Sequence, residues 1–216
     1  MDTGSKSYFE DVASQWDEMR KCFFSDRIRE KAYDLVDIEA GKLAADIGAG
    51  TGFITTGLIQ RGLSVVAVDQ SEQMLAEMSS KFAGIPGIEY RVGQAEELPI
   101  ADNAVDYVFA NMYLHHVERP PIAIKEMARI LRVGGKLAIT DMKTHNFQFL
   151  RTDHHDRWLG FEHEDIQNWF DHAGLEQVIV DDIDEKCNSS SANTEEIAEV
   201  DVFVAVGAKV SDDSDG

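Results

Sequence analysis

Hydrophobic and polar positions along the chain predict helices and strands in alternation. Apolar residues recur at helical spacing within 8–24, so one helix is expected there and a second over 26–36. The recurring residues of the first helix are Phe9, Val12, Trp16 and Met19. From residue 42 onward, short apolar runs bounded by glycine or aspartate are typical of buried strands. Strands are therefore predicted over 42–48, 64–69, 88–92, 104–110 and 136–141, and helices over 52–61, 71–81, 121–131 and 164–172.

Glycines and polar stretches predict where the later helices and strands begin and end. The helix over 121–131 is expected to stop at Gly134-Gly135. The polar stretch 187–196 is long for a hairpin connection and is expected to be a mobile loop. It separates two late strands, which are predicted over 177–183 and 200–206.

Strands that alternate with helices predict a doubly wound α/β fold, a parallel sheet with helices on both faces. Such sheets bind ligands beyond the carboxyl ends of their strands. The 216 residues suit a single domain. Residues just after each strand are therefore the candidates for a binding site.

Composition narrows the class of protein. Forty acidic residues against 20 basic ones give a formal charge of −20, which repels nucleic-acid phosphates and anionic membranes. No apolar run approaches the roughly 20 residues that span a bilayer, and the first residues do not resemble a signal peptide. A cytoplasmic protein is expected. Cys22 and Cys187 form no CxxC pair, so neither a disulfide framework nor a thiolate zinc site is predicted.

The strongest chemical signal is a glycine-rich run between the first predicted strand and the next helix. It reads Asp46-Ile-Gly48-Ala49-Gly50-Thr-Gly52. A dinucleotide fingerprint, G-x-G-x-x-G, would need its third glycine at position 53, where Phe53 stands. The observed spacing favours a nucleoside that carries an amino acid tail, whose ammonium group suits the Asp46 carboxylate.

Further candidates follow the other strands. Asp69 ends the second strand, where a carboxylate can accept both ribose hydroxyl protons, and Gln70 can flank an adenine. The loop after the third strand is expected at the adenine edge, and Asn111 after the fourth strand under the tail. The loop residues are Gln94, Ala95 and Glu96.

Together these segments resemble the class I S-adenosylmethionine (SAM)-dependent methyltransferases, in the branch that includes the quinone-biosynthesis enzymes. The matching segments also include Leu114-His-His-Val117 and 130–136, so the resemblance covers most of the chain. It implies a seven-stranded Rossmann-like sheet whose last strand is antiparallel, with SAM as cofactor. It implies a domain over 1–210, with a helical cap (1–40) whose Tyr8 and Trp16 close over the cofactor. A SAM-binding core (41–142) and a substrate lid (143–165) follow, and a disordered tail (211–216) ends the chain.

One narrower similarity and one departure accompany this resemblance. The combination of Asp141, His145 and 150–161 is similar to methyltransferase domains that often sit behind arsenic-type winged-helix repressors. Many class I relatives carry aspartate where this chain has Gln94. A glutamine carbonyl can still accept a hydrogen bond from the adenine amino group.

Methyl transfer from a sulfonium needs alignment of the partners, and a general base only where the acceptor must lose a proton. His115 and His116 follow the fourth strand and His145 follows the fifth, so these three are the catalytic candidates. The alternative is that the His115-His116 pair shapes the pocket floor. The predicted function is methylation of a small molecule by in-line displacement.

Two further readings stay open at this stage. The chain could bind SAM or a metal without turnover, or it could be a nicotinamide-dependent oxidoreductase, which the glycine spacing disfavours. No resident metal is expected. The weak candidates for a metal site are Asp141, His145, His154 and His155, because imidazole with carboxylate suits zinc, iron or nickel.

Overall fold

Seven strands form one mixed sheet, in the order β3-β2-β1-β4-β5-β7-β6. The computed structural model describes residues 3–211, so all but the first residue of the predicted tail lies outside the described part. The strands are β1 (Leu43–Ile47), β2 (Ser64–Asp69), β3 (Ile88–Val92), β4 (Val105–Asn111), β5 (Leu131–Met142), β6 (Leu175–Ser190) and β7 (Ile197–Lys209). The helices are α1 (Thr3–Val12), α2 (Trp16–Phe23), α3 (Arg27–Val36), α4 (Phe53–Gln60), α5 (Glu72–Lys81), α6 (Pro120–Ile130), α7 (Phe149–Asp153) and α8 (His163–His172).

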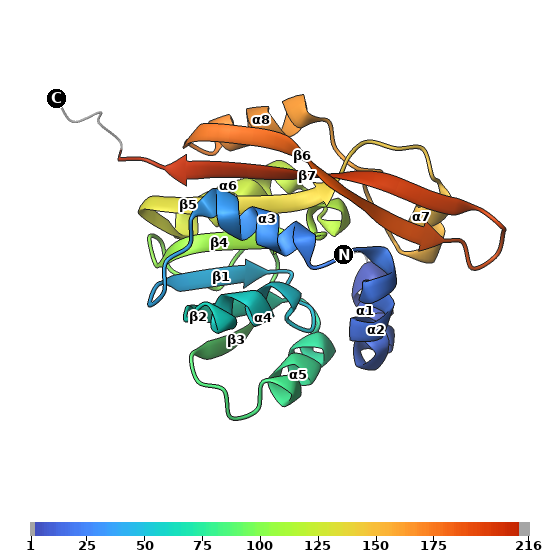
Figure 1. Cartoon of the computed structure of the whole chain (residues 1–216), viewed down its shortest axis with the longest axis horizontal. Helices are drawn as coiled ribbons and strands as arrows, with labels where there is room; N and C mark the ends of the chain where they lie inside the picture. The colour runs from blue at the N-terminus through green and yellow to red at the C-terminus, as the bar shows by residue number, and fades with distance from the viewer. Residues whose placement is uncertain (1–2, 212–216) are drawn as a thin grey trace.

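Strand pairing confirms the predicted topology. β3, β2, β1, β4 and β5 are parallel, while β7 runs antiparallel to both of its neighbours, β5 and β6. The arrowheads of β1, β4 and β5 point toward the side on which α1, α2 and α7 lie (Figure 1). The carboxyl ends of the parallel strands therefore face the N-terminal cap.

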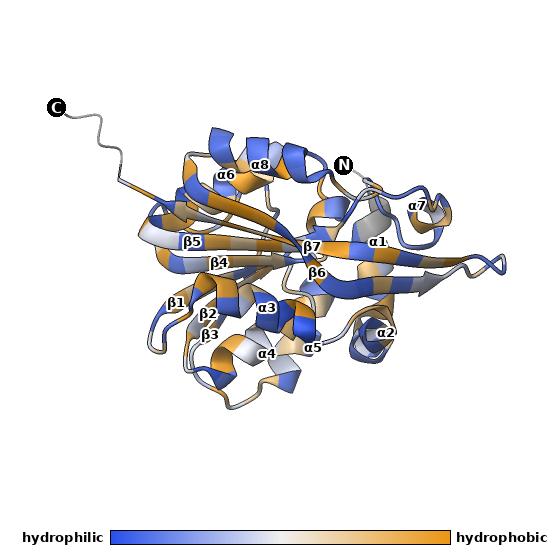
Figure 2. Ribbon diagram, turned by 45° about the horizontal axis from the view of Figure 1, so that its top comes forward, coloured by the Kyte–Doolittle hydropathy of each residue, from blue (hydrophilic) through white to orange (hydrophobic). Residues whose placement is uncertain are grey.

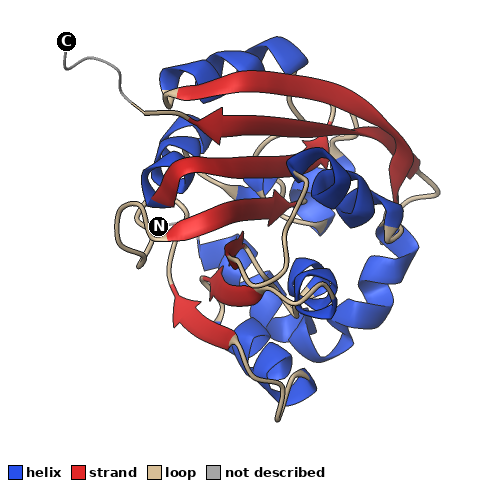
Figure 3. Cartoon of the chain, turned by 60° about the vertical axis from the view of Figure 1, so that its left-hand side comes forward, coloured by secondary structure: helices blue, strands red, loops and turns tan. Residues whose placement is uncertain are grey.

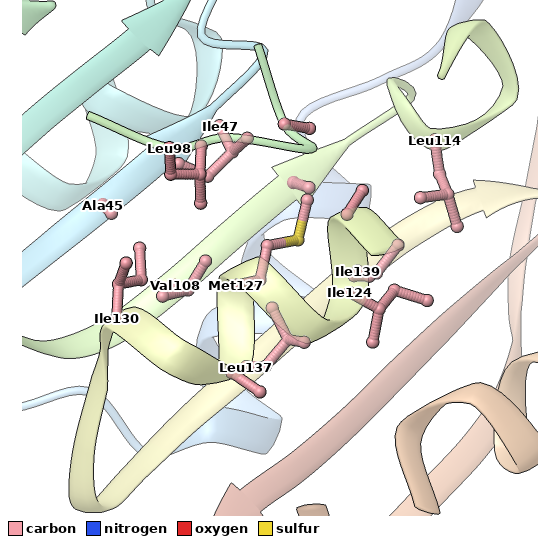
Figure 4. Close-up of a cluster of buried hydrophobic side chains, with 14 of the residues drawn as sticks. Ala45, Ile47, Leu98, Val108, Leu114, Ile124, Met127, Ile130, Leu137 and Ile139 are labelled. Carbon is pink, nitrogen blue, oxygen red and sulfur yellow. The ribbon is translucent and has the colours of Figure 1, made fainter. Parts of the chain in front are cut away.

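Helices cover both faces of the sheet (Figure 3). Because side chains alternate along a strand, β1 sends Ala45 and Ile47 into one core and Ala44 into the other. The first core packs the sheet against α6 and α8, and Met127 and Ile124 of α6 point at the strands there (Figure 4). The second core packs it against α3 and α4. Two buried faces explain why these strands read as continuous apolar runs.

The N-terminal segment is not the single helix predicted over 8–24. A 3₁₀ turn, η1 (Ala13–Gln15), separates α1 from α2. Ala13 is buried there, and η1 packs against α5. The turn also places the Phe9 and Trp16 rings edge to face, with 5.2 Å between their centroids.

Two boundary predictions were wrong for reasons of packing. The helix α6 ends at Ile130, before the glycines, because Leu131 is already extended and begins β5. Gly134 and Gly135 lie inside this strand; a Cβ on Gly135 would come within 2.7 Å of the Asp106 carbonyl oxygen. Gly135 thus allows close backbone approach beside a register shift in the β4–β5 pairing, between Val105 and Tyr107, while Gly134 supplies a φ of 81°.

The polar stretch 187–196 is only partly a loop, because its first four residues belong to β6. β6 and β7 pair as far as Ser190 and Ile197, so only 191–196 remains as the turn. Cys187 and Ser189 are half-buried while Asn188 and Ser190 are exposed, the period of two that a half-buried strand requires. The hairpin extends past the sheet beside α7 (Figure 1), and hydrophilic residues gather at its tip (Figure 2).

No helix within residues 3–211 is both long and apolar enough to cross a membrane.

Candidate active site

The glycine-rich run forms a tight loop between β1 and α4. Gly48, Gly50 and Gly52 all have positive φ, between 52° and 90°, which explains why glycine stands at these positions. The Gly50 amide donates to Asp69 Oδ2 at 2.8 Å, so the loop is tied to the end of β2. Asp46 Oδ2 accepts two hydrogen bonds from Thr55, one from the amide and one from the hydroxyl. The loop is therefore fixed by both predicted carboxylates.

A cavity opens over this loop, and it is called the glycine-loop cavity below. Nine residues predicted to bind the cofactor or to act in catalysis line it: Trp16, Asp46, Gly48, Ala49, Gly50, Asp69, Gln70, Asn111 and His116. Gly52 does not line it, because a Cβ there would meet Phe82 and Met78 in the packing against α5.

The electrostatics of the glycine-loop cavity are acidic. Burial, with a smaller contribution from the neighbouring Asp69 carboxylate, raises the pKa of Asp46 to about 7 against the two Thr55 hydrogen bonds that lower it. Burial also raises the pKa of Asp69, opposed by backbone hydrogen bonds from Ser71, Gly50 and Gln70. Two carboxylates that are costly to ionise in isolation favour a cationic ligand.

The cap closes the glycine-loop cavity from the other side. Phe9, Trp16 and Phe24 line it together with Arg20, whose guanidinium lies 4.2 Å from the centroid of the Phe53 ring. Arg20 Nε is buried and has no hydrogen-bond partner within the described residues. Asp17 joins the cap to the loop, since it accepts hydrogen bonds from Thr51 Oγ1 and from Lys81.

The loop predicted to face an adenine lies beyond Tyr113. Gln94 and Glu96 line a separate outer cavity, and Ala95 is buried outside both cavities. Gln70, Tyr113 and His116 line the outer cavity and the glycine-loop cavity alike. The Tyr113 ring packs on Gly48, where a Cβ would come within 2.3 Å of it, and burial raises the pKa of its phenol. Tyr113 thus stands at the junction of the two cavities.

A second cavity, the histidine cavity, adjoins the first and is lined mostly by apolar side chains. Phe9, Trp16, Phe24, Met112 and His116 form a wall common to both. Tyr8 lines the histidine cavity and not the cofactor side where it was predicted. The remaining polar or ionisable lining residues are His115, His154, Asp156, Cys187 and Ser189.

A buried trio of ionisable groups lies on one side of the histidine cavity. Asp141, at the end of β5, accepts from the His115 backbone amide and is bonded to His115 Nδ1 at 2.7 Å. The other ring nitrogen of His115, Nε2, lies 3.7 Å from Asp156 Oδ1. Burial opposes protonation of His115, but the two carboxylates prevail and raise its pKa to about 9. Burial raises the pKa of Asp156 to about 6, with Asp141 adding to it and His115 opposing it.

The lid over 143–161 is anchored on this trio. The backbone amides of Arg157 and Trp158 both donate to the His115 carbonyl, and the Trp158 indole donates to the Val117 carbonyl. At the lid's base, Lys143 forms a parallel β-bridge with Phe161. These bonds carry Asp156 to His115.

The remaining candidate histidines lie apart. His145 lines neither cavity; its Nδ1 accepts from the Phe147 amide, its Nε2 has no partner in the described chain, and burial lowers its pKa to about 4. His154 is bonded to Ser189 Oγ at 2.7 Å and lies 3.5 Å from the Tyr8 hydroxyl. The predicted metal candidates do not form a ligand group: the one group of three or more that the described residues contain is His115, His116 and Asp156.

The sequence did not predict every residue that lines the two cavities. Arg20 and Tyr113 lacked a motif, although Tyr113 closely follows β4 and could have been suspected from that position. Ser189 and Cys187 lie in the stretch predicted to be a loop. Burial raises the pKa of the Cys187 thiol to about 12.

Fold and site together define a Rossmann-like domain with two adjoining cavities at the carboxyl ends of its parallel strands. The family model "Methyltransferase domain" matches residues 45–139. An uncharacterized methyltransferase of Mycobacterium tuberculosis (strain H37Rv) is 43% identical over 109 residues, covering 50% of this chain and 43% of that protein. A demethylmenaquinone methyltransferase of Renibacterium salmoninarum is 33% identical over 147 residues, 67% of this chain and 61% of that protein. The crystal structure of the YcgJ protein from Bacillus subtilis matches with a TM-score of 0.72 at 17% identity, over 87% of this chain and all of that one.

These similarities support a class I SAM-dependent methyltransferase, as the motifs predicted. The chain spans less than two thirds of the length of the two curated relatives above. Its similarity to methyltransferases argues against the nicotinamide alternative. The similarity to repressor-linked domains stays a prediction.

Proposed function

We propose that this chain transfers the methyl group of SAM to a small-molecule acceptor, with SAM in the glycine-loop cavity and the acceptor in the histidine cavity. The observation that carries the proposal is the wall the two cavities share. Phe9, Trp16 and His116 line both cavities, so molecules bound in the two cavities would lie next to each other beside these side chains. In-line displacement needs this adjacency of donor and acceptor.

The residues of the glycine-loop cavity fit SAM. Asp46 and Asp69 suit its cationic groups, and the orphaned Arg20 Nε supplies a donor for a carboxylate. Gln70 and Tyr113 connect this cavity to the outer one, where Gln94 and Glu96 can meet an adenine. When bound, SAM supplies an activated methyl group on a good, neutral leaving group.

The chain's own residues then bind, orient and shield the acceptor. Residues of the aromatic cap and of the lid line the histidine cavity, so an acceptor bound there would be shielded from water, which would strengthen its polar contacts. His115 and Asp156 present polar atoms to an acceptor, and Asp141 orients the His115 ring through Nδ1. Demethylmenaquinone methyltransferases among the relatives agree with a small-molecule acceptor. A net charge of −20 disfavours a nucleic-acid acceptor.

Calorimetry with S-adenosylhomocysteine tests the cofactor site. In Gly50→Val, whose new Cβ would point toward Trp16 Nε1 at 3.6 Å, affinity should fall at least tenfold because the side chain enters the cavity. Gly84→Val is the matched control: Gly84 also has positive φ, but no atom lies within 4 Å of its Cβ position. It should bind as the wild type does. Equal affinity in all three proteins would contradict the assignment.

Turnover is tested by incubation of the protein with methyl-labelled SAM and a metabolite extract. A labelled small molecule that forms with wild-type protein and not with Gly50→Val supports an enzyme. Cofactor binding without any labelled product would favour the alternative, a SAM-binding protein without turnover.

A further inference from the structure

Three potential metal ligands meet where the glycine-loop and histidine cavities join. One ring nitrogen of His115, one of His116 and a carboxylate oxygen of Asp156 lie within 4.8 Å of one another. Asp156 Oδ1 lies 3.7 Å from His115 Nε2 and 3.8 Å from His116 Nδ1. Ligands about 2.0–2.1 Å from a zinc ion are roughly 3.3 Å apart in a tetrahedron. A small contraction would therefore bring these three atoms to bonding distance of one ion.

The His116 ring gives an independent indication that a ligand binds between these three residues. Its Nδ1 is buried and has no hydrogen-bond partner in the described chain, and its side chain is only 7% exposed. A buried polar nitrogen without a partner costs about 1–3 kcal/mol. This nitrogen lies on the side of the ring that faces Asp156.

His115 is held by a carboxylate in the way that is common for metal-binding histidines. Asp141 bonds Nδ1 at 2.7 Å, which leaves Nε2 to face the histidine cavity. Metal-bound histidines commonly donate their other nitrogen to a carboxylate, which fixes the ring and its tautomer. Asp141 and Asp156 also place two carboxylates around the position, which favours a cation.

We propose that His115 Nε2, His116 Nδ1 and the Asp156 carboxylate bind a divalent first-row transition metal ion, with Asp141 as the positioning residue for His115. Two imidazoles and one carboxylate suit zinc, cobalt or iron and leave coordination positions open. This group differs from the set predicted along the sequence and shares no ligand with it. The Cys187 thiol, whose pKa is raised to about 12, is not part of it.

The role of the ion rests on the proposed function. Its open positions face the histidine cavity, where they bind the oxygen or sulfur of an acceptor with a hydroxyl or thiol group. That group loses its proton to solvent on binding, since a cation stabilises the ionised form. The ionised atom forms a bond to the SAM methyl carbon as the bond from that carbon to the sulfonium sulfur breaks. The products are the methyl ether or thioether and neutral S-adenosylhomocysteine.

The metal site is tested first without SAM. Untagged protein purified without chelators is titrated with Co²⁺, whose visible absorption reports its coordination, and then with Zn²⁺ in competition. One equivalent should bind with micromolar or tighter affinity and give the spectrum of a four- or five-coordinate ion. Absence of stoichiometric binding at about 100 μM Co²⁺ in the wild type would overturn the site, whatever the variants do.

Variants then assign the ligands. His115→Gln and Asp156→Asn should each weaken Co²⁺ binding at least 100-fold, and Asp141→Asn about 10- to 100-fold through the His115 ring. His172→Gln is the matched control, since that exposed ring lies on α8 outside the cavities. Circular dichroism confirms folding of each variant, and if His115→Gln does not fold, Asp156→Asn decides. Binding that stays at the wild-type level in folded ligand variants would overturn the assignment.

The same preparation separates this proposal from the proposed function. S-Adenosylhomocysteine binding without Co²⁺ binding overturns the metal site and leaves the methyltransferase proposal standing. Co²⁺ binding without any S-adenosylhomocysteine binding does the reverse. Once the acceptor is found, methylation that is undiminished after removal of the metal would overturn the role of the ion.

Discussion

Asp46 is a buried carboxylate whose ionisation lowers the stability of the fold while it suits a cationic ligand. It is 1% exposed, lies at the end of β1 and has only Thr55 as its hydrogen-bonding side chain. Its pKa of about 7 lies above the usual value for aspartate because burial disfavours the charged form. The folded chain therefore holds a proton at Asp46 that the unfolded chain releases near pH 4.

We expect the stability of the protein to fall as the pH rises from about 4 to about 7. Since the folded pKa is raised, the stabilising contribution is complete below the unfolded pKa and is lost as the pH passes the folded pKa. At about 1.4 kcal/mol per unit, with the slope halved near the folded pKa, Asp46 accounts for roughly 2 kcal/mol between pH 5 and pH 7. Asp46→Asn should remove this pH-dependent contribution, because an amide does not titrate. The variant should still fold, because its amide oxygen can accept both Thr55 hydrogen bonds.

Urea unfolding of wild type and Asp46→Asn at pH 5 and pH 8 measures the difference. Asp34→Asn, which removes an exposed carboxylate of α3, is the control and should follow the wild type. An Asp46→Asn protein whose stability changes with pH as much as the wild type would show that the Asp46 carboxylate is not the cause.

At the scale of elements, one histidine joins the three segments that close the histidine cavity. His154, after the lid helix α7, is bonded to Ser189 Oγ on β6 at 2.7 Å and lies 3.5 Å from the Tyr8 hydroxyl on α1. The Phe23 ring of α2 meets it edge to face at 5.5 Å. Cap, lid and hairpin are thus linked, although they are far apart in sequence.

Ser189→Ala should loosen this connection. Loss of one side-chain hydrogen bond of about 1 kcal/mol predicts roughly fivefold faster amide exchange in α1, α2 and α7. Ser190→Ala, one residue further and exposed, is the matched control and should exchange as the wild type does. Exchange in the three helices that is equal in both variants would refute the link. S-Adenosylhomocysteine and acceptor should slow exchange in the same helices if these segments gate the site.

At the scale of the whole molecule, the net charge should make the stability of the fold depend on salt. A formal charge of −20 on 216 residues produces self-repulsion that favours expansion of the chain. From about 0.01 M to about 1 M NaCl the Debye length falls from ~30 Å to ~3 Å, which screens this repulsion. The melting temperature should therefore rise with NaCl, by roughly 2–4 °C for each kcal/mol gained.

A variant with fewer charges separates screening from other effects of salt. Glu176→Gln, Asp184→Asn and Glu195→Gln together remove three exposed carboxylates that form no ion pair within the described residues. Calorimetric scans across the NaCl series should show a smaller rise for the triple variant. A melting temperature that does not depend on NaCl in the wild type would contradict the prediction.

The local parts of the fold and of the glycine-loop cavity follow from the sequence. Asp46 near the end of β1, the glycine loop after it and Asp69 at the end of β2 all lie at strand ends, and the carboxyl ends of parallel strands meet at one edge. For this reason the parallel part of the sheet and most lining residues of the glycine-loop cavity could be predicted. The antiparallel last strand was implied only by the resemblance to methyltransferases. The place of Arg20 could not be predicted, because it depends on side-chain packing against Phe53.

The group of His115, Asp141 and Asp156 was decided by tertiary structure alone. β4 and β5 are neighbours in the sheet, which brings His115 beside Asp141 across 26 residues. The lid reaches the same place because the Arg157 and Trp158 amides bond the His115 carbonyl, and this carries Asp156 inward. His145 is only four residues from Asp141, yet its backbone amide bonds the Leu159 carbonyl at the base of the lid. Closeness in sequence therefore suggested the wrong partner, since side-chain direction at a strand end is set by the neighbouring strand and the lid.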